Sequence, residues 1–239
     1  MIRFIAEDLL QMAIVFPIIF IFLKDRNMDT LKILGAFFVY YFFHQILVYI
    51  PIQYPEARIG VSSWNWSGKL FAILGSIIFL AVYRKFPLGD YFLTFKQDKN
   101  FIYTGVGIIA IVWLIHSTYV YFSHGRIFDL ETLLFQFSMP GIDEEIAYRG
   151  IMHGLLLKVL KSKNTFLNPA LWTTALLFGM AHGLFLTESF ELAFHLTPFL
   201  WSLFYGLILG WITIKSGSIL LALISHNLGN GVGMLIKMQ

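Results

Sequence analysis

Long apolar runs without charged residues dominate this chain and predict helices that cross a membrane. A helix needs about 20 apolar residues to span the hydrocarbon of a bilayer. Seven runs meet or approach that length: Leu9–Leu23, Ile33–Pro55, Leu70–Tyr83, Phe101–Gly125, Asn164–Thr187, Leu192–Ile214 and Ser216–Ile236. The runs that begin at Leu9 and Leu70 are short, and the other five are long enough to cross.

An eighth span is predicted at about Gly141–Leu160, although charged residues interrupt its apolar character. These residues are Asp143, Glu144, Glu145 and Arg149. An ionisable group at the centre of a bilayer costs at least about 2.5 kcal/mol, so such residues indicate a functional site unless a partner neutralises them.

Together the runs predict an all-α fold, a polytopic membrane protein built as a bundle of about eight transmembrane helices. We expect a single domain over residues 1–239, with its motif-bearing core at about 141–236. Residues 128–139 carry two acids among apolar residues, and we expect them to lie in the membrane interface as an amphipathic segment.

Composition supports this class of protein. The chain is 58% hydrophobic and only 13% charged, whereas soluble domains carry about 25% charged residues. It has no cysteine, which excludes disulfides, thiolate chemistry and cysteine-based zinc sites. The net charge of +3 comes from loop lysines and arginines, so we interpret it as a topology signal and expect no nucleic-acid partner.

The distribution of Lys and Arg predicts how the protein sits in the membrane. Eleven of these residues fall in the loops after the first, third, fifth and seventh predicted helices, and five fall on the opposite side. The positive-inside rule therefore predicts a multi-pass protein, expected in the cell membrane, with both termini outside. With eight spans, Glu144, His182, His226 and Asn230 all fall in one leaflet.

The spacing of the charged residues in the eighth span predicts two roles. Glu145 and Arg149 are four apart and share a helix face, so we expect them to form a structural ion pair. Glu144 lies about 100° around the helix and lacks this partner. Glu144 is therefore predicted to be a free carboxylate that points into the bundle.

Two later helices each carry a polar residue paired with a second residue four positions away. Phe178 and His182 share one face, and His226 and Asn230 share another. A glutamate and a histidine can together bind and deprotonate water, while a histidine and an asparagine can donate hydrogen bonds to an oxyanion. A lone intramembrane histidine more often bridges helices; we expect only packing or interfacial roles for His44, His116, His124, His153 and His195.

The ordered set Glu144-Glu145-x-x-x-Arg149, Phe178-x-x-x-His182 and His226-x-x-x-Asn230 resembles the signature of the CAAX prenyl endopeptidase and bacteriocin-processing family, also called the CPBP or Abi family. Its members are intramembrane glutamic-type proteases. The resemblance covers about Asp143–Asn230, and each motif alone is weak.

This resemblance implies that Glu144 and His182 activate the water. It further implies that His226 and Asn230 form the oxyanion site, while Glu145, Arg149 and Phe178 support the geometry. The implied substrate is a membrane-associated peptide or a prenylated peptide, with membrane lipid as the surroundings. We expect no metal and no cofactor, with a zinc-dependent or other divalent-metal version of the same protease as the alternative.

Two interpretations from other classes stay open. One is a non-catalytic immunity or scaffold protein that keeps the motif for folding. The other is a small transporter in which Glu144 and His182 relay protons, although such proteins usually show repeated halves and this sequence has none.

Overall fold

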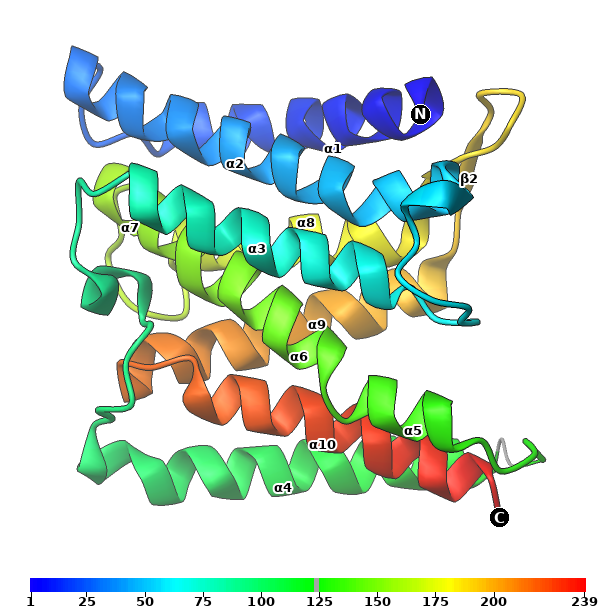
Figure 1. Cartoon of the computed structure of the whole chain (residues 1–239). Coiled ribbons are helices and arrows are strands. Elements are labelled where there is room, and N and C mark those ends of the chain that lie inside the picture. Colours follow the sequence, from blue (N-terminus) through cyan, green and yellow to red (C-terminus); the bar gives the residue numbers. More distant parts are fainter. Residues whose placement is uncertain (123–124) are drawn as a thin grey trace.

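The apolar runs of the sequence form helices that lie side by side (Figure 1). The computed structural model describes residues 1–122 and 125–239. The long helices are α1 (Ile2–Ile21), α2 (Met28–Gln53), α3 (Trp66–Val82), α4 (Lys99–Tyr121), α8 (Pro169–Gly183), α9 (Leu196–Ser216) and α10 (Leu220–Lys237). Short helices are η1 (Pro55–Ala57), η2 (Leu88–Tyr91) and α5 (Leu130–Gln136).

One further helical rod runs through the middle of the bundle and is built of three consecutive pieces. These are α6 (Met139–Glu144), the π-helix η3 (Glu145–Met152) and α7 (His153–Val159). Most of its side chains from Ala147 to Leu160 are buried. The rod packs against α2, α3, α8 and α10, so its charged residues are surrounded by protein.

The predicted all-α fold is confirmed, and each of the eight predicted spans coincides with a helix or with the central rod. By length and apolar character, α1, α2, α4 and α9 can each cross a membrane. The helices α3 and α8 are shorter, with 17 and 15 residues. The count of eight spans therefore stays a prediction. The fourth predicted run includes residues 123 and 124, which lie outside the described residues.

The predicted boundaries of the spans Asn164–Thr187 and Leu192–Ile214 are wrong because a small hairpin separates the two helices. The helix α8 ends at Gly183, and β1 (Leu184–Leu186) pairs antiparallel with β2 (Leu192–Phe194) before α9 begins. The hairpin is held to α1, since the backbone N–H of Leu186 donates to the Glu7 carboxylate at 2.9 Å. Apolar residues form the hairpin, so the sequence pattern resembles a continuation of the helices.

Polar residues at the helix starts explain where several helices begin. The side-chain oxygens of Asn27, Asn65 and Asn168 accept backbone N–H bonds from the first turns of α2, α3 and α8, which satisfies donors that have no partner inside the helix. Asp129 caps α5 in the same way. Hydrogen bonds from the Thr132 hydroxyl and from backbone N–H groups lower the pKa of the Asp129 carboxyl, because they favour its charged form.

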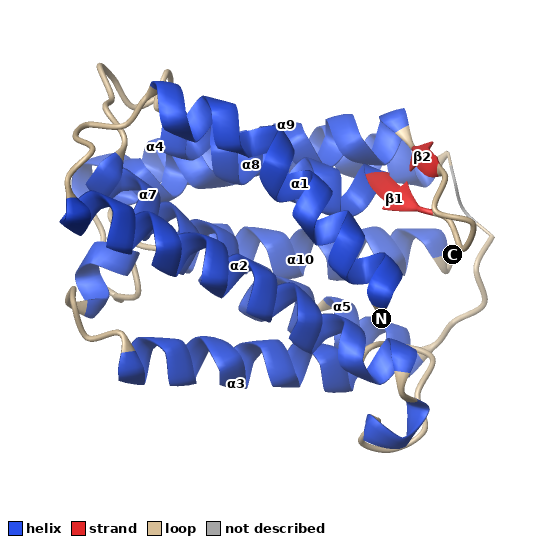
Figure 2. Cartoon of the chain, turned by 90° about the horizontal axis from the view of Figure 1, so that it is seen from above, coloured by secondary structure: helices blue, strands red, loops and turns tan. Residues whose placement is uncertain are grey.

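Both chain termini and the hairpin lie at one end of the bundle (Figures 1 and 2). The amino group of Met1 donates to the side chain of Gln53 at the end of α2, with a donor–acceptor distance of 2.7 Å. At the other terminus, the backbone carbonyl of Lys237 accepts bonds from Gly125 and Arg126. We call this end the terminal end.

Candidate active site

The predicted structural ion pair is present at the start of the π-helix. Arg149 Nη1 lies 3.0 Å from Glu145 Oε1, and both side chains are almost fully buried. Nδ1 of His226, on α10, donates to the same Glu145 oxygen at 2.7 Å. The Arg149 guanidinium also lies over the ring of Phe178, 4.2 Å from its centroid. Glu145 and Arg149 therefore join the central rod to α8 and α10.

Glu144 is not the free carboxylate that its sequence neighbourhood predicts. Lys69, in the first turn of α3, places its ammonium 2.7 Å from Glu144 Oε1 and 2.9 Å from Asp143 Oδ2. The spacing of residues within one helix does not reveal a partner that lies 75 positions away in the sequence. The second oxygen, Oε2, has no hydrogen-bond partner within the described residues and lies 3.7 Å from Nε2 of His226.

The ring of His182 is fixed by its own helix. Its Nδ1 lies 2.8 Å from the carbonyl oxygen of Phe178, one turn earlier. Because a carbonyl only accepts, Nδ1 carries the proton, and Nε2 of the neutral ring then has a lone pair. In the described part of the chain, His182 forms no ion pair with Glu144 within 4.0 Å. A water molecule can bridge two polar groups that are too far apart for direct contact.

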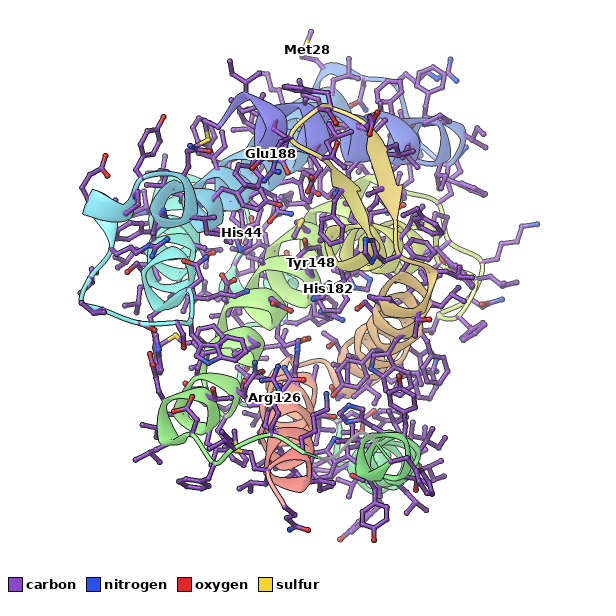
Figure 3. All side chains as sticks on the ribbon, turned by 90° about the vertical axis from the view of Figure 1, so that its right-hand side faces the viewer. Met28, His44, Arg126, Tyr148, His182 and Glu188 are labelled. Atoms are coloured by element: carbon purple, nitrogen blue, oxygen red, sulfur yellow. The ribbon has the colours of Figure 1, made fainter. Side chains whose placement is uncertain are left out.

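A cavity of about 390 Å³ brings the predicted catalytic residues together. Glu144, His182, His226 and Asn230 all line it, as does Phe178. Residues of α3, α4, α5 and α9 and further residues of α6 and α10 complete its wall: Lys69, Val112, Trp113, His116, Val120, Phe135, Gln136, Pro140, Trp201, Ser202, Tyr205, Gly229, Gly233, Met234 and Lys237. Glu145 and Arg149 do not line it and lie behind His226. Figure 3, viewed from the terminal end, shows His182 in the interior.

A second, smaller cavity reaches the same residues from the α2 side. It has a volume of about 140 Å³, and Glu144, His182 and Lys69 line both cavities. Its other lining residues are His44, Gln45, Val48, Tyr49, Tyr148 and Ala181. The carboxylate of Glu144 and the imidazole of His182 therefore lie between two hollow spaces.

The residues of the site do not fit a metal ion. Glu144, His182 and His226 are the donors that such an ion would need. However, no group of three His, Cys, Asp or Glu side chains within residues 1–122 and 125–239 has a metal-binding arrangement. The ammonium of Lys69 also takes the position next to Glu144 Oε1 that a cation would take. The expectation of metal-free chemistry nevertheless stays a prediction.

Several residues of the site had no clear signal in the sequence. His44 was expected only to pack, but its Nε2 lies 3.0 Å from Asp143 Oδ1, so the structure corrects that expectation. Asn227 accepts a hydrogen bond from the backbone N–H of Gly141 at 2.7 Å, which fixes α6 against α10. Lys69 directly precedes the apolar run Leu70–Tyr83 and was not predicted to belong to the site. The one available signal was a polar residue beside an apolar run, which topology also explains.

The remaining histidines lie in different environments. His116 stacks on Trp201, with ring centroids 5.4 Å apart, and lines the larger cavity. His153 is fully buried, and His195 meets the ring of Phe185 edge-on. His124 lies outside the described residues.

Buried polar side chains also join α1 to α2. The hydroxyl of Tyr41 donates to Gln11 at 2.5 Å, and the hydroxyl of Tyr49 donates to Glu7 at 3.4 Å. Asp8 is fully buried, and neither of its carboxylate oxygens has a hydrogen-bond partner among the residues that the structure describes. None of these contacts was predicted, because α1 and α2 read as generic spans in the sequence.

Comparison with known protein families gives a match. Residues 126–232 match the family described as Rce1-like, type II CAAX prenyl endopeptidase. The matched segment includes every motif residue, from Glu144 to Asn230. Comparisons with curated proteins and with solved structures gave no match.

Proposed function

We propose that this chain, whose residues 126–232 match the Rce1-like type II CAAX prenyl endopeptidase family, hydrolyses peptide bonds of membrane-associated or prenylated peptides with a water activated by Glu144 and His182. One observation carries this proposal: side chains from the central rod, α8 and α10 meet around a single cavity. Residues far apart in a sequence that converge on one hollow space are typical of an active site.

The attacking water lies between the unpartnered Oε2 of Glu144 and the lone pair on Nε2 of His182. Lys69 engages the other Glu144 oxygen, so Oε2 is the atom that takes the proton. The water oxygen then bonds to the carbonyl carbon of the peptide. The proton on Glu144 passes to the peptide nitrogen as the carbon–nitrogen bond breaks, which leaves a carboxylic acid and an amine.

The developing oxyanion is stabilised by His226 and Asn230. Since Nδ1 of His226 already donates to Glu145, its Nε2 can donate to an oxyanion only if both ring nitrogens carry protons. The carboxylates of Glu145 and Glu144 both lie within 4.0 Å of this ring. The amide group of Asn230 supplies the second donor. One such donor is worth about 10²- to 10³-fold in rate.

The test compares purified wild-type protein in lipid vesicles with Glu144→Gln, using prenylated and unprenylated peptides. Glutamine keeps the shape of the side chain but cannot accept the proton, so cleavage should fall by about 10²- to 10⁴-fold. The variant should remain folded and inserted. Wild-type cleavage that persists with a chelator is expected; loss with a chelator would favour a metal-dependent protease.

The same experiment separates the other classes. Full activity in Glu144→Gln would remove the carboxylate from the chemistry and contradict the mechanism. No cleavage of any peptide by the wild type would favour a scaffold or immunity protein. Proton-coupled flux across the vesicle membrane without cleavage would favour a transporter.

A further inference from the structure

One face of α10 lines the larger cavity from the catalytic residues to the terminal end. His226, Asn230, Gly233 and Lys237 follow one another at intervals of four, three and four residues, and all four line the cavity. That spacing keeps side chains on one face of a helix. Asn230 and Lys237 are seven residues apart, which places them about 10 Å apart along the helix axis.

The far end of this cavity carries a positive charge that no carboxylate of the described residues pairs with. Near Glu144, the ammonium of Lys69 is paired with two carboxylates. Lys237 is half-buried, and no carboxylate lies within 4.0 Å of its ammonium in the described part of the chain. Such a cation in a cavity favours an anionic ligand group.

Hydrogen bonds hold the backbone of Lys237 in place. Its backbone carbonyl accepts hydrogen bonds from Gly125 and Arg126 at 3.0 and 2.8 Å. The ring of His116 lies against Gly233, where an added Cβ would come within 2.9 Å of the ring, and this ring stacks on Trp201. The end of the cavity is therefore walled by aromatic rings.

The distance between Asn230 and Lys237 matches a short peptide. An extended chain advances about 3.3–3.6 Å per residue, so three residues cover about 10 Å. We propose that Lys237 binds the C-terminal carboxylate of the peptide substrate and thereby places the scissile carbonyl three residues upstream at Asn230. This inference rests on the proposed function. A carboxyl-terminal Cys-a-a-X sequence has three residues after its cysteine, so cleavage at that cysteine fits the spacing.

The experiment uses two peptides of identical sequence, one ending in a free carboxylate and the other in a carboxamide. The wild type should cleave the carboxylate form about tenfold more efficiently, as kcat/KM, because a charged hydrogen bond is lost in the amide. Lys237→Met should bring this ratio close to one, and Lys237→Arg should preserve it. The matched control is Lys215→Met, which removes an exposed lysine at the opposite end of the bundle and should keep the wild-type ratio.

A length series tests the spacing. Adding one residue after the C-terminal position moves the carboxylate by about 3.5 Å, so the preference for the carboxylate form should shrink. Equal cleavage of the two forms by the wild type, or an unchanged ratio in Lys237→Met, would overturn the inference. A Lys237→Met effect that vanishes in vesicles of purely zwitterionic lipid would instead assign the ammonium to lipid headgroups.

A binding measurement separates this inference from the proposed function. The catalytically impaired Glu144→Gln protein should bind a tripeptide with a free carboxylate about tenfold more tightly than its amide, and the double variant with Lys237→Met should not. If the wild type cleaves no peptide while this binding difference is observed, the proposed function is wrong and carboxylate binding by Lys237 is supported. If cleavage occurs without a binding difference, only carboxylate binding by Lys237 is wrong.

Discussion

At the scale of single residues, Lys69 has the greatest influence on Glu144. Its ammonium contacts both Asp143 and Glu144, and Asp143 also contacts His44. The two carboxylates lie next to each other in sequence inside a packed bundle, where like charges repel strongly. The Lys69 ammonium offsets this repulsion, and His44 lies within hydrogen-bonding distance of Asp143. The position of the proposed base therefore depends on residues from α2 and α3, outside the segment that matches the family.

Replacing Lys69 by methionine should destabilise the fold and reduce cleavage. Removing one partner of a buried ion pair leaves an uncompensated charge and costs about 3–5 kcal/mol. Thermal unfolding in detergent measures the first effect, and hydrolysis of a prenylated peptide measures the second. Adding Asp143→Asn should recover part of the stability, since one carboxylate charge is removed. An unfolding temperature equal to that of Lys215→Met would show that Lys69 does not stabilise the fold through its ion pairs.

At the scale of elements, the placement of α6 against α10 sets the distance from Glu144 to His226. The two helices are joined where the Gly141 backbone N–H donates to Asn227. A Cβ at position 141 would lie 2.4 Å from the Asn227 side-chain oxygen. A larger residue fits there only if the Asn227 side chain shifts and loses its hydrogen bond to Gly141, or if one of the two helices moves.

Gly141→Ala should therefore break the hydrogen bond to Asn227, by displacing that side chain or by pushing α6 away from α10, and lower both stability and kcat. Overpacking of this kind costs about 1–3 kcal/mol. The matched control is Gly107→Ala on α4, where an added Cβ meets no atom within 4 Å and should be neutral or stabilising by about 0.5–1 kcal/mol. Both variants are compared by thermal unfolding and by the rate of peptide cleavage. Equal behaviour of the two would contradict the close contact at Gly141.

The spacing of residues along the sequence predicted the helices and the side-chain pairs within one helix. It did not predict the contacts between side chains of different helices. Glu145 and Arg149 are four residues apart, so their ion pair followed from helix geometry. The contact between His44 and Asp143 spans 99 positions, and no periodicity encodes it. The π-helix was also missed, because its hydrogen-bond pattern has no marker comparable to proline or to a cap.

At the scale of the whole molecule, the position of the terminal end decides where a peptide enters. The larger cavity extends toward this end through Met234 and Lys237. Charge counting places the terminal end outside the cell, whereas a lipidated substrate made in the cytosol would require it inside. The orientation of the bundle is thus a separate property from its chemistry.

Single cysteines test the orientation, because the natural chain has none. Ser63→Cys lies in the exposed segment between α2 and α3 at the terminal end, and Ser162→Cys lies in the exposed segment between α7 and α8 at the other end. The charge distribution predicts that a membrane-impermeant thiol reagent labels position 63 in intact cells and spares position 162. Permeabilised cells, in which both should react, are the control. Labelling of position 162 alone would reverse the orientation.

The π-helix makes the direction of Glu144 tolerant of one change in chain length. A π-turn closes its hydrogen bond over five residues instead of four, so it holds one residue more than an α-turn. Shortening the segment 145–152 by one residue would therefore let an ordinary α-helix form in its place, while α6 and α7 keep nearly the same rotation relative to each other. The loss of one residue from a rod that is α-helical throughout would instead rotate everything on the amino-terminal side by about 100°. A single missing codon in this stretch should thus leave the acid facing the same neighbours.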